Sequence, residues 1–311
     1  MTDLVSLNGT PTRRFVFGTM QFGGRADANA SRAMYDACRA AGITHFDTAW
    51  IYTGGESETL LGRFAAPERE ALIIASKVGY SGGSGGANIR AQFDQSRARL
   101  GMDSIDLLYL HLFDGDTDLR ETIEALATLK QAGQIRYIGV SNFAAWQVMK
   151  AQAVAAEFDL AIDVIQPMYN LVKRQVEVEL LPMSVDQKIS VAPYSPLGGG
   201  LLTGKYTSGG AGRLSEDDRY AARYGPEWMH DTARNLATVA AELNTDPATL
   251  AVAWVARHSA RPMPIISGRA TEQLPPSLAA LDFEMDDALY ARLSALSPTP
   301  PPPTDRIEEQ L

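Results

Sequence analysis

The chain is poor in the residues that build disulfide frameworks and metal sites. Its 311 residues include a single cysteine, Cys38, so no disulfide can form within the chain. No base is placed beside Cys38, and we interpret it as a small buried hydrophobe of a protein in the reducing cytoplasm rather than as a nucleophile. The four histidines show no metal-ligand spacing with cysteine or acidic residues, so no metal site is predicted.

Positive charge and long apolar runs are also scarce. Lysine and arginine number 28 against 37 aspartate and glutamate residues, which gives a net charge of −9 and argues against a nucleic-acid-binding surface. No apolar run approaches the roughly 18 residues of a membrane span, and residues 1–12 lack the basic start and apolar stretch of a secretory leader. We therefore expect a cytoplasmic protein that binds neither nucleic acid nor membranes.

Two common nucleotide-binding motifs are missing from the sequence. No G-x-G-x-x-G segment opens an early strand–helix–strand unit, so a Rossmann dehydrogenase is not expected. The segment from Gly199 to Lys205 has the G-x-x-x-x-G-K pattern of a phosphate loop, but Tyr206 stands where that loop needs a serine or threonine for magnesium. The sequence therefore argues against a phosphate-loop hydrolase as well.

The chain does contain a regular alternation of two patterns. Short apolar runs rich in β-branched residues predict strands, and longer stretches with helical periodicity separate them. The predicted strands are residues 15–20, 44–48, 72–77, 106–111, 137–141, 164–168, 189–195 and 264–268. The predicted helices are residues 29–41, 57–64, 89–100, 119–132, 144–156, 172–183, 231–243 and 247–258. This alternation predicts parallel strands joined by helical crossovers, and the length fits either two domains or one closed barrel.

Two loops and a tail interrupt this alternation. The glycine-rich residues 81–86 follow the third predicted strand and can serve as a lid over a site or as a simple linker. Asn88 is expected to cap the helix that follows them. Residues 205–230 form an irregular, mixed-charge segment after the seventh predicted strand. From about residue 297, consecutive prolines predict an extended tail, because proline cannot continue a helix and supplies no hydrogen-bond donor.

Ionisable side chains end three of the predicted strands. Asp47 and Tyr52 follow the second strand, Lys77 ends the third and His111 the fourth, and a barrel carries its chemistry at strand ends. A carbonyl is reduced when a donor protonates its oxygen while hydride reaches its carbon, and Tyr52 is the candidate donor. Its ordinary pKa of about 10 requires a nearby ammonium such as Lys77 to stabilise the phenolate. Asp47 would hold Lys77 protonated, and His111 would donate a hydrogen bond that orients the carbonyl.

Each of these residues also has a structural explanation. Taken singly, a loop tyrosine is more often a packing residue, a strand-end lysine a solvated terminus and a histidine part of the core. Their occurrence at successive strand ends favours a catalytic group instead. His45 shares the strand face of Asp47 one layer deeper, and we interpret it as a hydrogen-bonded core histidine.

The order and spacing of these segments, together with three later ones, resemble the aldo-keto reductase family. The six segments are THFDTAWIY at 44–52, LIIASK at 72–77, DLLYLH at 106–111, GVSN at 139–142, QPMYN at 166–170 and YSPLGGGLLTGKY at 194–206. The resemblance extends from about residue 15 to about residue 281 and implies a single (β/α)8 TIM barrel over residues 1–311, with long loops after strands 3 and 7. In the family, the residues that match Asp47, Tyr52, Lys77 and His111 form the catalytic tetrad.

The resemblance also implies a nicotinamide cofactor. Hydroxyl, amide and aromatic groups after the later strands match the family residues that bind and stack the nicotinamide. Arg269 suits a 2′-phosphate, because a guanidinium gives paired charge-assisted hydrogen bonds, so NADPH is favoured over NADH. Ser277 stands where the family usually carries asparagine, which leaves the adenine contacts open. The implied cofactor contacts are Thr19, Met20, Asp47, Ser141, Asn142, Gln166, Tyr194, Ser195, Leu197, Gly199, Lys205, Arg213, Ser267, Arg269 and Gln273.

We therefore expect an NADPH-dependent oxidoreductase that reduces a small-molecule aldehyde or ketone. Two alternatives stay open: an NAD(P)-dependent alcohol or sugar dehydrogenase, and a non-catalytic, NADPH-binding sensor or channel-associated subunit on the same barrel. The sequence predicts no oligomeric state. The expected substrate contacts, placed by their loops, are Trp50, Tyr80, His111, Phe113, Arg223 and Trp228.

Two arginines, Arg219 and Arg223, lie four residues apart in the long loop after the seventh predicted strand, beside Tyr220 and Tyr224. They can share one helical face and hold an anionic group, while the aromatic rings cover an apolar or sugar face. The alternative is a solvated helical turn in which both arginines pair with the acidic residues 216–218. The first interpretation predicts a polar or anionic carbonyl, such as a modified sugar aldehyde, as the substrate.

Overall fold

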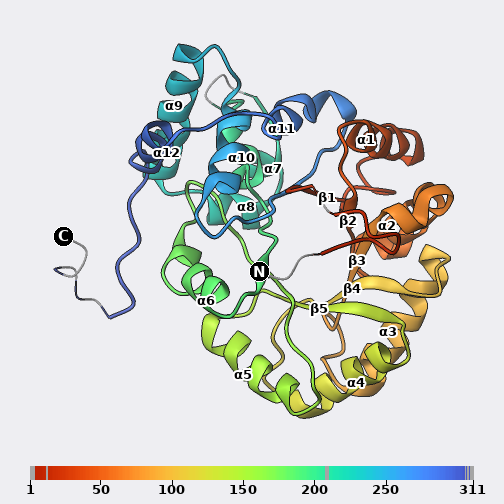
Figure 1. Ribbon diagram of the computed structural model, residues 1–311. Coiled ribbons are helices and arrows are strands. Elements are labelled where there is room, and N and C mark those ends of the chain that lie inside the picture. Colours follow the sequence, from red (N-terminus) through yellow and green to blue (C-terminus); the bar gives the residue numbers. More distant parts are fainter. Residues whose placement is uncertain (1–3, 12, 207–209, 305, 307, 309–311) are drawn as a thin grey trace.

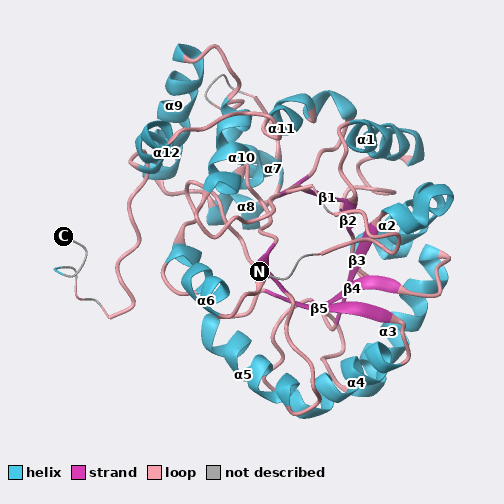
Figure 2. Ribbon diagram, in the orientation of Figure 1, coloured by secondary structure: helices cyan, strands magenta, loops and turns pink. Residues whose placement is uncertain are grey.

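The centre of the molecule is a ring of parallel strands, shown by the computed structural model in Figure 1. The structure describes residues 4–11, 13–206, 210–304, 306 and 308. The strands are β1 (Val16–Gly18), β2 (His45–Asp47), β3 (Ile73–Val78), β4 (Ile105–Leu110), β5 (Ile135–Ser141), β6 (Val164–Gln166), β7 (Ser190–Val191) and β8 (Ile265–Ile266). Within the described residues they pair in the order β7-β6-β5-β4-β3-β2-β1-β8, and a parallel bridge between Tyr194 and Ile265 closes the ring. Helices surround it (Figure 2), so the predicted (β/α)8 barrel is confirmed.

Every predicted strand run contains a strand, but the run 189–195 is interrupted soon after its start. Pro193 lacks an amide hydrogen and cannot donate to the neighbouring strand. The backbone nevertheless keeps its register, because the Tyr194 amide donates to the Pro167 carbonyl oxygen at 2.9 Å. This contact carries Tyr194 to the carboxyl-terminal end of the barrel.

The helices lie between the strands and in the last third of the chain. They are α1 (Ala28–Ala40), α2 (Glu56–Ala65), α3 (Gly86–Leu100), α4 (Leu119–Gln131), α5 (Ala145–Ala156), α6 (Leu180–Asp186), α7 (Arg213–Glu216), α8 (Asp218–Arg223), α9 (Glu227–Glu242), α10 (Pro247–Arg257), α11 (Pro275–Ala279) and α12 (Asp287–Ser294). The predicted helix 172–183 begins too early: residues 172–179 contain only a short 3-10 turn, and α6 starts at Leu180. Pro182 is tolerated only in a first helical turn, which fixes the late start of α6.

Alternate residues of each strand face opposite sides and separate two apolar layers. On β4, Leu107 and Tyr109 belong to the barrel interior, whereas Leu108 and Leu110 pack into the outer core with the helices. A Cβ atom at Gly139 of β5 would lie 2.3 Å from the Tyr109 side chain, so that position requires glycine. The packed interior supports the polar side chains at the strand ends.

The glycine-rich loop after β3 is tied to its surroundings by hydrogen bonds. Asn88 lies inside α3 rather than before it, so the predicted cap is wrong. Its side-chain amide instead donates to the carbonyl oxygens of Ser81 and Gly83, at 2.9 and 2.7 Å. The Ser84 amide donates to the Asp114 carboxylate at 2.7 Å. These contacts join the loop to α3 and to the loop after β4.

The long segment after β7 contains a 3-10 stretch at Gly198–Thr203, followed by α7 and α8. Residues 207–209 of the predicted loop 205–230 lie outside the described residues. So do residues 1–3 and 12 of the amino-terminal segment 1–12, for which no secretory leader is predicted. Beyond α12, residues 297–304 run without regular structure away from the barrel (Figure 1). No helix in the described part of the chain is long and apolar enough to cross a membrane.

Candidate active site

A cavity of about 710 Å³ opens at the carboxyl-terminal ends of the strands. Most side chains selected from the sequence line this cavity. They are Met20, Asp47, Tyr52, Tyr80, His111, Ser141, Asn142, Gln166, Tyr194, Ser195, Leu197, Gly199, Lys205, Arg213, Arg223, Ser267, Arg269 and Gln273. Because these residues come from strand ends and from the segments that follow them all around the barrel, the cavity crosses its carboxyl-terminal face.

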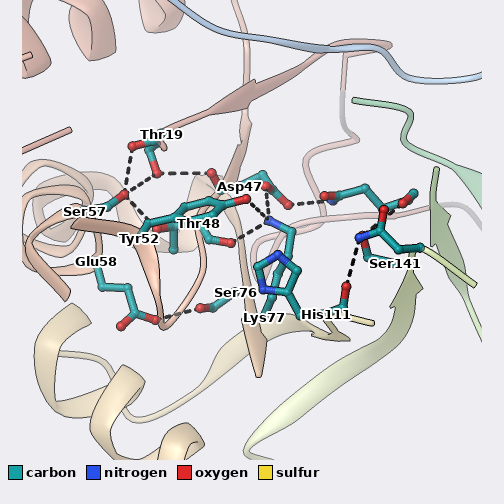
Figure 3. A network of polar contacts seen from close by, with 12 residues as sticks. Thr19, Asp47, Thr48, Tyr52, Ser57, Glu58, Ser76, Lys77, His111 and Ser141 are labelled. Atoms are coloured by element: carbon teal, nitrogen blue, oxygen red, sulfur yellow. Dashed lines mark hydrogen bonds and ion pairs between the residues drawn. The ribbon is translucent and has the colours of Figure 1, made fainter. Parts of the chain in front are cut away.

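Lys77 lies at the end of β3, buried among oxygen atoms (Figure 3). Its ammonium forms an ion pair with the Asp47 carboxylate of β2. It also donates to the Thr48 carbonyl oxygen at 2.8 Å and to the Tyr52 hydroxyl at 3.4 Å. The other Asp47 oxygen accepts a hydrogen bond from Gln166 Nε2 at 2.9 Å. One continuous chain of polar contacts therefore runs from Gln166 to Tyr52.

Burial and charge act in opposite directions on this group. Burial alone would lower the pKa of Lys77, but the Asp47 carboxylate and Tyr52 outweigh it, so the pKa is raised. Burial raises the pKa of Tyr52, and the Lys77 ammonium opposes that rise. At neutral pH the lysine is charged and the tyrosine carries its proton, and the lysine favours release of that proton.

The loop that carries Tyr52 is anchored from behind by α2 and α3. Glu58 of α2 is fully buried and accepts hydrogen bonds from Ser76 Oγ at 2.6 Å and from Arg99 at 3.2 Å. The same Arg99 guanidinium donates to the Trp50 carbonyl oxygen at 2.8 Å. One buried carboxylate thereby fixes the backbone two residues before the phenol.

His111 follows β4 and faces the Tyr52 ring edge-on, with ring centroids 5.9 Å apart. The Tyr80 ring lies on another side, at 4.9 Å. Asn142 donates to the His111 carbonyl oxygen at 3.0 Å. Burial and the nearby Lys77 ammonium lower the pKa of His111 to about 3, so the imidazole is neutral and carries one N–H donor.

His45 lies deeper in the barrel and is fully buried, as the sequence predicted. Burial and the Lys77 charge lower its pKa to about 3. The predicted hydrogen bond is wrong, because neither ring nitrogen has a partner among the described residues. Its partners on the neighbouring strands, Val16 and Ile73, are apolar and offer no side-chain acceptor.

The polar side chains after β5 and β6 form a connected wall of the cavity. Ser141 Oγ donates to the Gln166 carbonyl oxygen at 3.0 Å, and Asn142 Nδ2 donates to Ser141 Oγ at 3.1 Å. The Tyr194 hydroxyl donates to Asn142 Oδ1 at 2.7 Å. Asn142 has a φ of 59°, a left-handed conformation that asparagine adopts more readily than most residues. The wall presents amide groups and an aromatic ring, which fit a carboxamide-bearing ring.

Cationic side chains line other parts of the cavity. The Arg213 guanidinium lies 5.4 Å from the Tyr220 ring centroid and donates to the Tyr220 hydroxyl at 3.3 Å. In the described residues, the buried Arg269 Nη2 and Ser267 Oγ atoms have no hydrogen-bond partner. Buried polar atoms are rarely left unpaired, so these two fit the oxygen atoms of a phosphate group. The residues present therefore fit a phosphorylated dinucleotide.

Glu216 of α7 connects two loops that are distant in the sequence and adjacent on the barrel face, beside this phosphate-fitting region. It accepts hydrogen bonds from Arg25, before α1, at 2.5 Å and from Arg269, after β8, at 3.1 Å. These bonds lower the pKa of Glu216, so its carboxylate is ionised at neutral pH. They fasten the segment containing α7 to the loops that follow β1 and β8.

Two predicted contacts near β1 and β2 do not line the cavity. Thr19 is fully buried, and its hydroxyl lies 2.9 Å from Ser57 Oγ and donates to the Asp47 carbonyl oxygen at 3.1 Å. Trp50 turns toward α3, because its indole N–H donates to Gln95 at 2.9 Å. Both side chains support the Tyr52 loop instead of facing the cavity.

Two further predicted aromatic contacts also lie outside the cavity lining. Phe113 packs edge-on against Phe143 and Trp146, with ring centroids 5.3 and 5.7 Å apart. Trp228 is in the first turn of α9, which begins four residues earlier than predicted, and 38% of the residue is exposed. The direction of the Phe113 side chain is set by its aromatic neighbours, and that of Trp228 by its place in α9. Neither could be read from the sequence pattern.

Several residues of the cavity lining were not among the predicted site residues, and Tyr220 and Asp246 are two that carry polar groups. Tyr220 of α8 packs so closely over the turn after β7 that a Cβ at Gly199 would lie 2.7 Å from its ring. The positive φ of 66° at Gly199 is the matching backbone signal. Asp246 caps α10 by accepting from the Ala248 amide at 2.7 Å, and it also lines the cavity.

Comparison with known proteins places this site in a family. The Aldo/keto reductase family model matches residues 14–298. The chain is 33% identical to the uncharacterized oxidoreductase YrpG of Bacillus subtilis, with 94% of each chain covered. It is 33% identical to aflatoxin B1 aldehyde reductase member 2 of Rattus norvegicus, over 89% of this chain and 82% of that one. A probable voltage-gated potassium channel subunit beta of Oryza sativa is 31% identical, with 84% of each covered.

The solved structure of a glycerol dehydrogenase from Gluconobacter oxydans superposes with a TM-score of 0.81 at 26% identity, covering 95% of this chain and 94% of that one. The chain belongs to the aldo/keto reductase family of oxidoreductases.

Proposed function

We propose that this protein reduces an aldehyde or ketone to the alcohol with NADPH. The observation that carries the proposal is the Tyr52 hydroxyl, which lines the cavity 3.4 Å from the ammonium of Lys77. NADPH bound in the cavity would supply hydride to the carbonyl carbon. Tyr52 would give its proton to the carbonyl oxygen, and Lys77, held by Asp47, would stabilise the phenolate that remains. The neutral His111 would donate its N–H to the same oxygen.

The protonation state of Tyr52 suits the proton-donor role that carbonyl reduction requires. Oxidation of an alcohol needs a phenolate that accepts a proton, whereas reduction needs a neutral phenol. Burial raises the pKa of Tyr52, so the neutral form that can donate a proton to a carbonyl dominates at neutral pH. The similarity to a glycerol dehydrogenase supports the dehydrogenase as the second candidate.

The preference for NADPH rests on Arg269. Its Nη2 atom is buried without a partner among the described residues, although Nη1 is paired with Glu216. A 2′-phosphate would give that nitrogen an acceptor, which NADH lacks. We also propose a cytoplasmic location, because the chain has a single cysteine, Cys38, and therefore no internal disulfide of the kind that oxidising compartments favour.

Oxidation of NADPH in the presence of a panel of neutral, anionic and sugar-like carbonyls tests the proposal, with NADH run beside it. We expect turnover of aldehydes and faster turnover with NADPH. NADPH binding without oxidation by any carbonyl would support the non-catalytic alternative, to which the similarity with a probable channel subunit also points. Faster alcohol oxidation with NAD⁺ than carbonyl reduction would support the dehydrogenase.

A further inference from the structure

We propose that the mouth of the cavity contains a subsite for an oxyanion of the substrate, formed by Arg223 with Lys173 behind it. The inference rests on the proposed carbonyl reduction and names its substrate class: an aldehyde or ketone that carries a carboxylate or similar group away from the carbonyl. Guanidinium and ammonium groups together suit such an oxyanion, because both donate charge-assisted hydrogen bonds.

The two arginines of α8 have different surroundings. Arg219 pairs with Asp217 at 3.2 Å, and 82% of its side chain is exposed. Arg223 lines the cavity and forms no ion pair with a carboxylate in the described part of the chain. The solvated-turn interpretation therefore holds for Arg219 alone. Arg223 is a cation that faces the cavity without a counter-charge.

A stacked pair of tyrosines supports the two cations. Arg223 lies 5.4 Å from the Tyr220 ring centroid, and the Lys173 ammonium lies 5.6 Å from the Tyr224 ring centroid. The two rings stack with centroids 6.4 Å apart and an interplanar angle of 27°. Lys173 also forms no ion pair within the described residues. The rings hold two like charges near one another, and an oxyanion bound beside them would relieve their repulsion.

The charge pattern around Lys173 and Tyr194 agrees with this placement. Burial, followed by the Arg223 charge, lowers the pKa of Lys173. Arg223 also opposes the rise in the pKa of Tyr194 that burial causes. Tyr194 belongs to the wall that contains Asn142, next to His111. The Arg223 charge therefore acts on the part of the cavity wall that adjoins His111, within reach of the end of a short substrate that lies away from its carbonyl.

The test compares para-carboxybenzaldehyde with its methyl ester, which differs by one negative charge. In Arg223→Gln, we expect the ratio of kcat/KM for the acid to kcat/KM for the ester to fall by about tenfold or more, mainly through KM, as expected for loss of a hydrogen bond to a charged group. Lys173→Gln is expected to lower the ratio by a smaller factor. Arg219→Gln, the matched control on the same helix, is expected to leave both rates unchanged.

The outcomes separate this proposal from the proposed function. If Arg223→Gln keeps the wild-type ratio, the subsite is wrong while carbonyl reduction stands. If Arg223→Gln loses NADPH affinity by as large a factor, Arg223 serves the cofactor and the subsite is again wrong. If wild type reduces neither aldehyde, the proposed function fails. In that case, titration of the NADPH complex with para-toluate and its methyl ester decides: tighter, Arg223-dependent binding of the acid supports the subsite, and equal binding overturns it.

Discussion

Replacing Asp47 by asparagine should remove the counter-charge that keeps Lys77 protonated inside the barrel. Both side chains are almost completely buried, so the ammonium of the variant would be left without an anion in a poorly solvated place. The asparagine cannot accept from both neighbours, because one of its two polar atoms is a donor that would face either Lys77 or Gln166 Nε2. We expect a loss of about 3–5 kcal/mol in the free energy of unfolding.

Lys77→Met should cost a similar amount, since it leaves the Asp47 carboxylate buried without its ammonium. The double variant should be less destabilised than the sum of the two single variants, because it leaves no unpaired charge. We expect a coupling free energy of about 2 kcal/mol or more in this cycle, within the range found for contacting residues. Urea unfolding of the four proteins measures it. Additive losses would refute the view that the two charges stabilise each other.

The remaining predictions concern the cofactor and acid stability. Arg269→Ala should weaken NADPH by about 1.5–3 kcal/mol and NADH much less, because only NADPH carries the 2′-phosphate; titration by protein fluorescence measures both, and equal weakening would contradict that role. In the unfolded chain His45 takes up a proton below its ordinary pKa of about 6.5, whereas in the folded protein it stays neutral down to about pH 3. The free energy of unfolding therefore falls as the pH falls from about 6.5 to about 3. His45→Leu should therefore reduce the slope of unfolding free energy by about 1.4 kcal/mol per pH unit near pH 5, and an unchanged slope would disprove the buried neutral imidazole.

The barrel could be predicted because strand periodicity and strand-end chemistry are local properties of the sequence. Asp47, Lys77 and His111 each end a strand, and the parallel register brings those ends to one face. The failure at 172–183 has a local cause as well. Pro182 carries no amide hydrogen and fits only the first turn of a helix, which excludes a start as early as residue 172 and agrees with the observed start at Leu180.

The side-chain directions in the loops could not be predicted in the same way. Trp50 turns away from the cavity because of Gln95, which is 45 positions later in the chain. Phe113 packs against Phe143, which follows β5 and is 30 positions later in the chain. Such partners are set by tertiary packing, and a single sequence does not reveal them.

Arg219 and Arg223 show the same distinction on one short helix. Their spacing correctly indicated a shared helix, α8, but the pairing of each depends on which way that helix faces the barrel. Asp217 lies two residues before Arg219 and forms an ion pair with it, whereas Arg223 lines the cavity. The sequence allowed both interpretations, an anion-binding face and a solvated turn, but could not show that the first applies to Arg223 and the second to Arg219.

Single-turnover reduction of an aldehyde by the Tyr52→Phe variant tests the central claim most directly. The ring stays in place and only the hydroxyl beside Lys77 is removed. We expect NADPH affinity to be nearly unchanged while the rate of NADPH oxidation falls by about 10²-fold or more, the contribution of a positioned general acid. Retention of a substantial fraction of the wild-type rate, with normal NADPH binding, would contradict the assignment of Tyr52 as the proton donor.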